Sequence, residues 1–582
     1  MDPLSIFGLV QTCYEVGAKL IEICDCWKNA ESEVQARLLK VRSCWFRSRS
    51  QVEFMRRVSA IIEDDLRRLF GDLMRQLATC LREASAQLNS VIQRGEDAKP
   101  GFLVFGGRAK KAAYVWKKEA LDGIIADMEE WQSRFDPSWF LIMTIASPTI
   151  DNELRRARAS AGMIERAPGG APSAANNPLA LASGLRTTLS SDAKPPSFLS
   201  SFPMETVDIP YSALKIARRT GDSKWYVVDS IDCSPYPDVK ALARDVRVLA
   251  ARLSQADPVA FGLLNCKGVI AASQTQQQGV PSLDSSSPPQ PAGANHLAPL
   301  NTSRSISRSP SPSNYRQISN FTLLFRFPEG MEVLQSLRQM LLNSDANISL
   351  GRKVRIAREM AKSVAYVHTF DFVHKNIRPE SFLCFEPPDG ASSSGGLSSH
   401  AFLAGFDAFR AATGATMMHG DLTWDCNVYR HPLRQGYNPA EKYRMQHDIY
   451  SLGVCLLEVG LWEPFVEYSS PESGGRSVHP MAGKSFHHFN AWLEQKNAAR
   501  QDGSKATSTE RQGFLDLLAF KLKDYLVEQA ETRLPARMGA KYTRVVLACL
   551  SCLDEDRYPG DDRQVAVQYI EDIMMNLGGI SV

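Results

Sequence analysis

The residues FVHKNIRPESFL, at 372–383, form the most informative segment in the second half of this chain. Three further segments follow it: FLAGFD at 402–407, YRHP at 429–432 and HDIYSLGVCLLE at 447–458. Each of these short segments is a weak signal by itself. Their order and spacing along one chain make them a strong signal for one fold.

Together the four segments resemble a protein kinase. Residues 372–383 are similar to the catalytic loop H-R-D-L-K-P-E-N-I-L, and residues 402–407 lie where that family has its D-F-G element. Residues 429–432 match part of the end of the activation segment, and residues 447–458 look like the D-[IV]-[YW]-S-[LF]-G helix. The resemblance implies a two-lobed α+β protein-kinase-like fold over residues 202–582.

The two expected lobes differ in texture. The large lobe, residues 331–582, is mainly helical in pattern. The small lobe holds β-prone runs and one helical pattern. The small lobe spans residues 202–330. Its β-prone runs are 225–228, 261–266 and 321–327, and its helical segment is 238–253.

An insertion interrupts the small lobe at residues 272–317. It is rich in Gln, Ser and Pro, and such a composition buries too little apolar surface to fold alone, so we expect it to be disordered. Ser309 and Ser311 lie in it, each before a proline and near an arginine. Both are candidate sites for proline-directed phosphorylation, and an unmodified tether is the alternative.

The residues that would carry phosphoryl transfer are replaced. The reaction needs a carboxylate to accept the substrate proton, ligands for magnesium and a lysine for the phosphates. Asn376 stands at the carboxylate position, and Ser381 and Gly405 stand at the metal-ligand positions of the resemblance. Loss of a general base alone costs about 10²–10⁴-fold in rate. We therefore expect a pseudokinase with no catalytic residue, no metal and no cofactor.

The upstream lobe lacks the signals for nucleotide binding as well. No G-x-G-x-x-G occurs between residues 204 and 228, the run YVVDSID has no lysine, and the helical segment 238–253 has no glutamate. Asp229 and Asp245 remain there, and acidic side chains repel phosphates. Binding of ATP and magnesium is expected only under the alternative of a weakly active or unconventional kinase.

Other positions of the resemblance have structural interpretations. We expect His374 to be a packing or hydrogen-bonding residue. Arg378 is expected in a structural ion pair, with contact to an anion as the alternative. The family uses the positions of Asp448 and Arg557 structurally. Leu433 stands where the usual acidic partner of Arg557 would be, so the anchoring of the activation segment is in doubt.

The N-terminal part has the pattern of helices throughout. Apolar residues recur at steps of three and four within 9–27, 34–45, 61–92 and 121–131, which is the spacing of one helix face. Because each apolar stripe must be covered by another, these segments predict an all-α helical bundle at residues 1–160. The following stretch, 161–201, is rich in Ala, Pro, Ser and Asn and predicts a disordered interdomain linker.

The expected bundle resembles the fungal HeLo, or prion-inhibition-and-propagation, domain in its opening MDPLSIFGLV and in the stretch 108–135. HeLo bundles are cell-death effectors whose first helix can insert into membranes when released. The alternative is that the first helix is core and the basic residues form a solvated face. The resemblance implies membrane contact by apolar residues of the first helix and by a later basic cluster: Leu4, Ile6, Phe7, Leu9, Val10, Arg108, Lys110, Lys111, Lys117 and Lys118.

The overall composition is typical of an intracellular protein. A net charge of +3 on 582 residues gives no global signal for nucleic acid, and the N-terminus lacks the basic region of a secretory signal peptide. The twelve cysteines are scattered and are expected as reduced thiols. We expect a cytoplasmic protein with protein partners, regulated recruitment to membrane and homo-oligomerisation through the bundle.

These features favour a non-catalytic signalling or regulatory protein that contains a pseudokinase. The resemblance extends this to a fungal incompatibility or cell-death effector whose bundle acts on membrane or on partner proteins. Two alternatives from other classes stay open. One is a weakly active kinase that binds ATP, and the other is a structural interaction scaffold without membrane activity.

Overall fold

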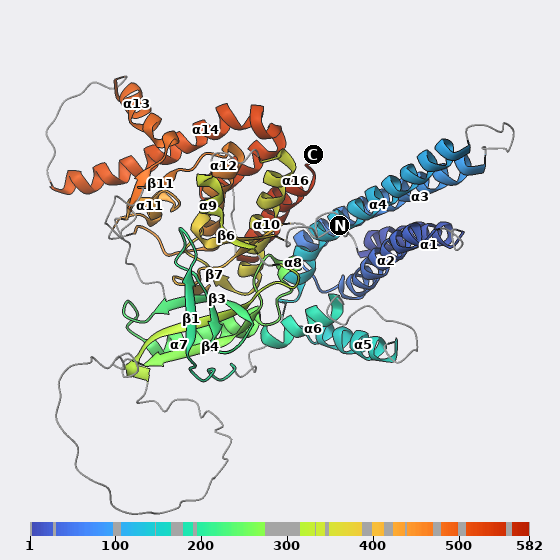
Figure 1. The fold of residues 1–582 in the computed structure, drawn as a ribbon, viewed down its shortest axis with the longest axis horizontal. Coiled ribbons are helices and arrows are strands. Elements are labelled where there is room, and N and C mark those ends of the chain that lie inside the picture. The colour runs from blue at the N-terminus through green and yellow to red at the C-terminus, as the bar shows by residue number, and fades with distance from the viewer. Residues whose placement is uncertain are drawn as a thin grey trace, which may run out of the picture.

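The chain falls into an N-terminal helical part and a C-terminal part that mixes helices with small antiparallel sheets, as the sequence predicts. Figure 1 shows the two parts side by side. The structure is a computed structural model that describes residues 3–26, 31–96, 106–145, 147–164, 178–189, 195–273, 315–331, 333–343, 348–386, 399–412, 423–436, 439–469, 479–498, 508–554 and 562–580.

The N-terminal bundle consists of four helices: α1 (Pro3–Asp25), α2 (Ser32–Val58), α3 (Asp64–Glu96) and α4 (Gly106–Ile142). Helix α1 packs against α2 and α3, and α4 closes the ring by packing against the same two helices. The hairpin of α3 and α4 projects away from the rest of the molecule (Figure 1). The leucine stripe of α3 is buried inside the ring: Leu66, Leu69, Leu73, Leu77, Leu81 and Leu88.

Helices α1 and α2 approach closely at Gly17. A Cβ atom at this position would lie 2.2 Å from a ring carbon of Trp45, so only glycine leaves room for the indole. Tyr14, one turn earlier, meets the same indole edge to face, with 6.4 Å between the ring centroids. Among the described residues, no helix has the length and the apolar character needed to cross a bilayer.

Two more helices follow the bundle: α5 (Pro148–Ile164) and α6 (Pro178–Leu189). Helix α6 lies inside the stretch 161–201, where the composition suggests a disordered linker. Arg186 holds α6 against the bundle side, because its Nε pairs with Asp151 of α5 at 2.8 Å and its Nη1 donates to the carbonyl of Met143 at 3.1 Å. The buried side of α6 rests on small and medium apolar residues, which a composition rich in alanine conceals.

The C-terminal part begins with a five-stranded antiparallel sheet in the order β1-β2-β3-β5-β4. Helix α7 (Val239–Leu253) confirms the helical segment expected at 238–253. It begins after Asp238, whose carboxylate accepts from the backbone N–H of Ala241 at 3.0 Å. The strands are β1 (Met204–Asp208), β2 (Lys215–Arg219), β3 (Trp225–Asp232), β4 (Cys266–Ser273) and β5 (Ile318–Arg326).

The strand expected at 261–266 is wrong. A short helix, α8 (Pro258–Phe261), ends at the first residue of that range, and β4 begins only at its last residue, Cys266. Between them, Leu263 makes only an isolated bridge with Leu403. The carboxylate of Asp257 caps α8 by accepting from the N–H of Ala260 at 2.8 Å, and Pro258 occupies the first helical position. A short apolar run cannot distinguish strand from helix by periodicity, and the cap decides between them here.

The rest of the C-terminal part is a helical unit with short strands. Its central helix α12 is buried along its whole length and packs against α14. Gly453 permits this approach, since a Cβ there would lie 2.6 Å from the Cβ of Cys549. The helices are α9 (Leu337–Leu342), α10 (Leu350–Thr369), α11 (Trp424–Asn427), α12 (Met445–Leu461), α13 (Lys484–Ala498), α14 (Ser508–Leu550), α15 (Asp562–Tyr569) and α16 (Met575–Gly578), with a π-helical turn η7 (Ile570–Met574) between the last two.

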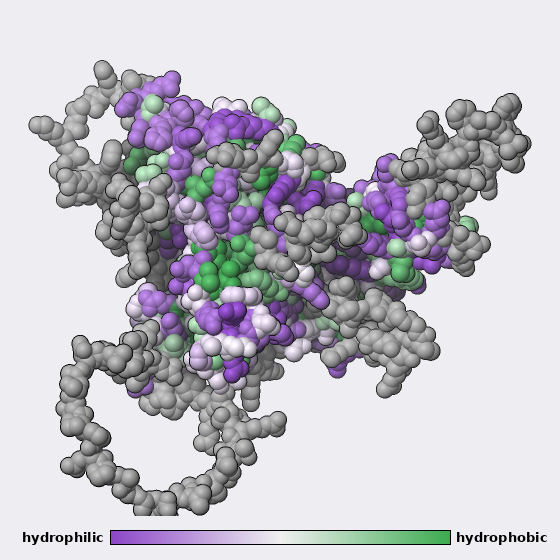
Figure 2. Space-filling view, viewed as in Figure 1, coloured by the Kyte–Doolittle hydropathy of each residue, from purple (hydrophilic) through white to green (hydrophobic). Residues whose placement is uncertain are grey.

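The short strands of the helical unit form three small antiparallel sheets. One has the order β6-β8-β9, and the other two are the pairs β7–β10 and β11–β12. In Figure 2, apolar side chains gather between the helical unit and the five-stranded sheet, while polar side chains cover much of the outer helical surface. The strands are β6 (Val333–Ser336), β7 (Phe372–Val373), β8 (Phe382–Glu386), β9 (His400–Leu403), β10 (Arg410–Ala411), β11 (Val466–Tyr468) and β12 (Pro480–Ala482).

Candidate functional site

The candidate site lies where the loop after β7 meets the loop after β9, beneath the five-stranded sheet. His374 is fully buried there. Its Nε2 contacts the carbonyl oxygen of Ala404 at 3.1 Å, and its backbone N–H donates to Asp448 at 2.8 Å. Burial lowers the pKa of His374, so the ring is neutral. These contacts match the packing role expected from the sequence.

Asn376 is engaged within the protein on both its side chain and its backbone. Its side-chain amide donates to the Oδ1 atom of Asp407 at 2.9 Å. The hydroxyl of Ser381 donates to the backbone carbonyl of Asn376 at 2.5 Å. The structure therefore brings the two replaced positions, 376 and 381, into direct contact and adds Asp407 as a partner that the sequence did not single out.

Gly405 lies next to this pair and has a backbone φ of +80°. This left-handed conformation suits glycine and strains residues with side chains. A Cβ at Gly405 would also stand 3.4 Å from the hydroxyl of Ser381. The backbone N–H of Ala404 donates to the carbonyl of Ser381 at 2.9 Å, which fixes the two loops together. An aspartate at position 405 would have to adopt a strained backbone to occupy the same place.

Asp229 connects the five-stranded sheet to this loop. It lies on β3 with its carboxylate buried, and its Oδ2 accepts from the backbone N–H of Phe406 at 2.6 Å. Burial is the main cause that raises the pKa of Asp229 to about 7, and the negative charge of Asp407 adds to it. The sequence marks Asp229 only as an acidic residue within YVVDSID, a segment that contains no lysine. The contact with Phe406 joins residues 177 positions apart, so no local signal reveals it.

Asp448 braces the loop that carries the site. Its two carboxylate oxygens accept from the backbone N–H groups of His374 and Lys375, at 2.8 and 2.9 Å, and from the hydroxyl of Tyr443 at 2.7 Å. His368 adds a contact of 3.1 Å. Burial opposes the charge of Asp448, but these hydrogen bonds prevail and lower its pKa. The arrangement holds Lys375 at a φ of +67°, which is uncommon for a residue other than glycine.

The segment around Tyr429 is anchored by a buried ionic network. Arg338 is fully buried and pairs with Glu380 at 2.7 Å and with Glu458 at 2.8 Å. The hydroxyl of Tyr429 donates to Glu458 at 2.8 Å and also contacts Arg338. Burial opposes the charge of Arg338, yet the two carboxylates raise its pKa, so the guanidinium stays charged. No local pattern in the sequence singles out Arg338, because its partners lie 42 and 120 residues away.

Arg378 forms an ion pair with Asp425 of α11. Its Nη1 lies 3.6 Å from the carboxylate of Asp425 and 3.2 Å from the sulfur of Cys426. Arg557 lies outside the described residues, as do Ser309 and Ser311. Within the residues that the structure describes, no group of three or more His, Cys, Asp or Glu side chains is placed to hold a metal ion.

The candidate membrane residues are distributed over the bundle. Ile6 and Val10 are fully buried in its core, and Leu9 is half-buried. Phe7 is 51% exposed, and the guanidinium of Arg56 stands 5.1 Å from its ring centroid. Leu4 lies in the first turns of α1. The basic residues lie on α4: Arg108, Lys110, Lys111, Lys117 and Lys118. Lys118 pairs with Glu33 of α2.

Chemically, the site links its own groups to one another. The amide of Asn376 donates to Asp407, the hydroxyl of Ser381 donates to a backbone carbonyl, and the buried carboxyl of Asp229 accepts from the adjacent loop. No protein-family model matches the chain, and the search of curated proteins finds no match either. The fold and the geometry of the site are therefore the basis for assigning a function.

Proposed function

We propose that this chain is a non-catalytic, kinase-like regulatory protein, in which a pseudokinase region controls an N-terminal HeLo-like bundle. The observation that carries the proposal is the hydrogen bond from Asn376 to Asp407 at 2.9 Å. The kinase resemblance assigns position 376 to the catalytic base, and the neutral amide that stands there is engaged within the protein. An amide cannot accept a proton from a substrate hydroxyl at neutral pH.

The charges around the site support the same conclusion. Asp407 belongs to the loop at 405–407, and the carboxyl group of Asp229 accepts from the backbone of that loop, so both bring acidic and not basic side chains to the site. A nucleotide triphosphate needs positive charge or a magnesium ion to balance its phosphates. Gly405, at a φ of +80°, has no carboxylate with which to hold that ion. We infer that the site maintains the shape of the region and does not bind Mg-ATP.

A thermal-shift titration with ATP tests this part of the proposal. The full chain is titrated with ATP alone, with magnesium alone and with both together. We expect no shift of Tm that requires both ligands. A saturable stabilisation that appears only with ATP and magnesium together would support the alternative of a weakly active kinase. A kinase assay with a generic substrate protein distinguishes nucleotide binding from phosphoryl transfer.

The second part of the proposal concerns the bundle. The apolar residues Ile6 and Val10 of α1 face the bundle core, and α4 contacts the helical unit of the C-terminal part. In this arrangement the first helix must leave its partners before it can meet a bilayer. We therefore propose that the C-terminal part holds the bundle in an inactive state. Partner proteins and regulated membrane association in the cytoplasm follow from this proposal.

Dye release from liposomes tests the role of the bundle. The full chain and a fragment of residues 1–160 are added to vesicles that contain phosphatidylserine and to vesicles of phosphatidylcholine alone. We expect release by the fragment, stronger with the anionic lipid because of the basic residues on α4, and none by the full chain. No release by a fragment that circular dichroism shows to be helical would favour the interaction scaffold instead.

A further inference from the structure

The last described residues of the chain lie between the bundle and the helical unit. Arg134 of α4 donates from Nη2 to the carbonyl of Gly578 at 2.6 Å. Arg358 of α10 donates to the carbonyls of Leu577, Gly578 and Ile580 at 3.0, 3.1 and 2.6 Å. One arginine from each part of the molecule thus binds the same short backbone segment. Gly578 is the residue that both arginines share.

The backbone carbonyls at this end have a physical need for such partners. The last carbonyl groups of a helix have no intrahelical donor, and the end carries partial negative charge. Two guanidinium groups satisfy both conditions. Glu130 of α4 joins them, since it pairs with Arg134 one turn away on the same helix and lies 3.8 Å from Arg358. Lys541 adds a hydrogen bond to the carbonyl of Gly579 at 2.8 Å.

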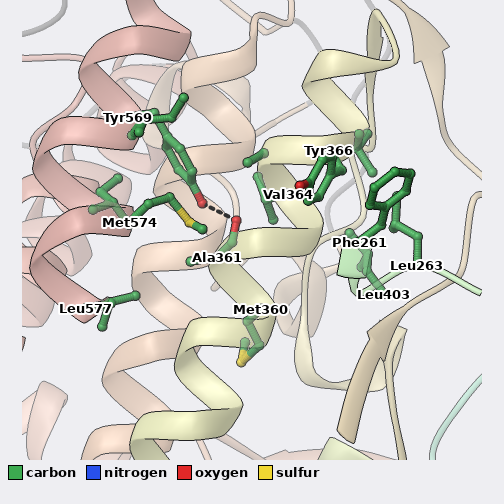
Figure 3. Packing of buried hydrophobic residues seen from close by; sticks show 14 of the residues in the cluster. Phe261, Leu263, Met360, Ala361, Val364, Tyr366, Leu403, Tyr569, Met574 and Leu577 are labelled. Atoms are coloured by element: carbon green, nitrogen blue, oxygen red, sulfur yellow. Dashed lines mark hydrogen bonds between the residues drawn. The ribbon is translucent and has the colours of Figure 1, made fainter. Parts of the chain in front are cut away.

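Apolar packing closes the junction next to this polar cluster. Pro137 and Leu141 of α4 meet residues of α10, α12 and α15 around a cavity of about 10 Å³, which is no larger than a single water. The hydroxyl of Tyr569 donates to the carbonyl of Ala361 at 2.7 Å, as Figure 3 shows, and so ties α15 to α10. Met574 and Leu577 lie on the same side of α10 as Tyr569 does (Figure 3). Helix α15 and the turn η7, which pack against α10, thus continue directly into the segment that Arg134 binds.

We propose that residues 575–580 form an internal clasp that holds the bundle on the helical unit, and that loss of the bond from Arg134 to Gly578 releases the bundle. The proposed control of the bundle would act through the clasp, so the role of the clasp in that control rests on the proposed function. The contact between the bundle and the helical unit does not depend on that function. The clasp can be broken at a single point, because Arg134 binds one backbone carbonyl. The apolar junction, in contrast, spreads over several helices.

Gly578 offers a specific way to open the clasp. A Cβ at this position would lie 2.5 Å from Nε and 2.8 Å from Cγ of Arg134, so the arginine must move away. It has room to do so, because a cavity of about 380 Å³ between α3 and α4 is lined by Arg134 itself and by neighbours such as Gln76 and Glu130. Gly578→Ala should therefore break the bond without unfolding the helix. Gly579→Ala is the matched control, since its Cβ would come no closer than 3.5 Å to any atom.

Hydrogen exchange measured by mass spectrometry on the full chain tests the clasp. We expect Gly578→Ala to speed exchange in residues 134–142 by about tenfold or more and Gly579→Ala to leave it unchanged. Arg134→Gln, which removes the charged donor without adding bulk, should act as Gly578→Ala does. Unchanged exchange in both Gly578→Ala and Arg134→Gln would overturn the proposal, and so would equal effects of Gly578→Ala and Gly579→Ala.

The same variants separate the clasp from the proposed function. Dye release from phosphatidylserine vesicles is measured for the full chain that carries Gly578→Ala. Faster exchange together with release supports both proposals. Faster exchange without release supports the clasp and counts against membrane action by the bundle. Release without faster exchange would show that the bundle acts by another route and would overturn the clasp.

Discussion

At the scale of single residues, the polar side chains of Asn376 and Asp229 are engaged in contacts within the protein. Asn376 is a neutral donor to Asp407 at 2.9 Å. Asp229 is a buried acid that accepts from the N–H of Phe406 at 2.6 Å. Each contact joins a carboxyl group to a neutral N–H donor, so neither brings two charged groups together. Substitutions that add charge here are therefore expected to cost stability without creating activity.

Asn376→Asp places a carboxylate where the proposed kinase resemblance has its base, and we expect no phosphoryl transfer from this variant. The new carboxylate faces Asp407, so a hydrogen bond is exchanged for repulsion between like charges, at a cost of about 1–3 kcal/mol. We expect a lower Tm and no transfer of labelled phosphate from Mg-ATP. Asn376→Ala is the control, because it removes the hydrogen bond without adding charge and should lower Tm less. Detectable phosphorylation by Asn376→Asp would contradict the proposed loss of catalysis.

Asp229 predicts a particular dependence of stability on pH. Its pKa is about 7 in the folded chain and about 3.9 in an unfolded one. Below about pH 4 both states hold the proton. As the pH rises further, the unfolded chain loses the proton first, so the stability of the folded chain falls until the pH passes about 7. Asp229→Asn should remove this fall, which amounts to a few kcal/mol at about 1.4 kcal/mol per pKa unit.

Denaturant midpoints of wild type and Asp229→Asn between pH 4 and pH 8 measure this effect. Comparison with wild type cancels other groups, such as His431 and His447, in which burial lowers the pKa to about 3. Asp232→Asn is the control on the same strand. Asp232 is exposed, and its hydrogen bonds with Ser234 lower its pKa, so it should not change the slope above pH 4. Parallel curves for wild type and Asp229→Asn would contradict the shifted pKa.

At the scale of elements, the network of Arg338 ties α9, α12 and the segment at Tyr429 together. All of its charges are buried, and each depends on the others. Removal of the central cation takes from Glu380 and Glu458 the ion-pair partner that they share, in a medium of low polarity. The network thus makes the relative placement of three elements depend on one side chain.

Arg338→Met should lower stability by about 3–5 kcal/mol, because two buried carboxylates lose their partner. Arg352→Met is the matched control in the same unit. Arg352 pairs with Glu386 at the half-exposed surface, and such a pair contributes about 0–1 kcal/mol. Midpoints of urea unfolding for the two variants measure the difference. Similar midpoints would show that the network contributes little.

At the scale of the whole molecule, one apolar core runs from the bundle into the helical unit. Leu141 lies near the end of α4, is 5% exposed and lines the small cavity at the junction. Leu88 is also buried, with 1% of its surface exposed, and lies in the C-terminal third of α3. The two leucines have the same chemistry and differ in which parts of the molecule they join.

Leu141→Ala and Leu88→Ala should each cost about 2–5 kcal/mol, through lost burial and a cavity. We expect Leu141→Ala to speed hydrogen exchange in both α4 and α10, because its side chain packs between them. Leu88→Ala should affect the bundle helices and leave α10 unchanged. Identical exchange patterns for the two variants would contradict a junction that couples the two parts.

Local patterns in the sequence are enough to predict the helical N-terminal part, the stripe of α3 and the limits of α7, because the apolar period of a helix is carried by neighbouring residues. They do not reveal α6, whose composition conceals its apolar side, and they predict a strand at 261–266, where α8 ends and β4 begins. The pairs of Asn376 with Asp407 and of Asp229 with Phe406, and the clasp at Gly578, come from the tertiary arrangement alone. Those contacts join residues far apart in the chain, and such residues meet only after the elements that carry them share a core.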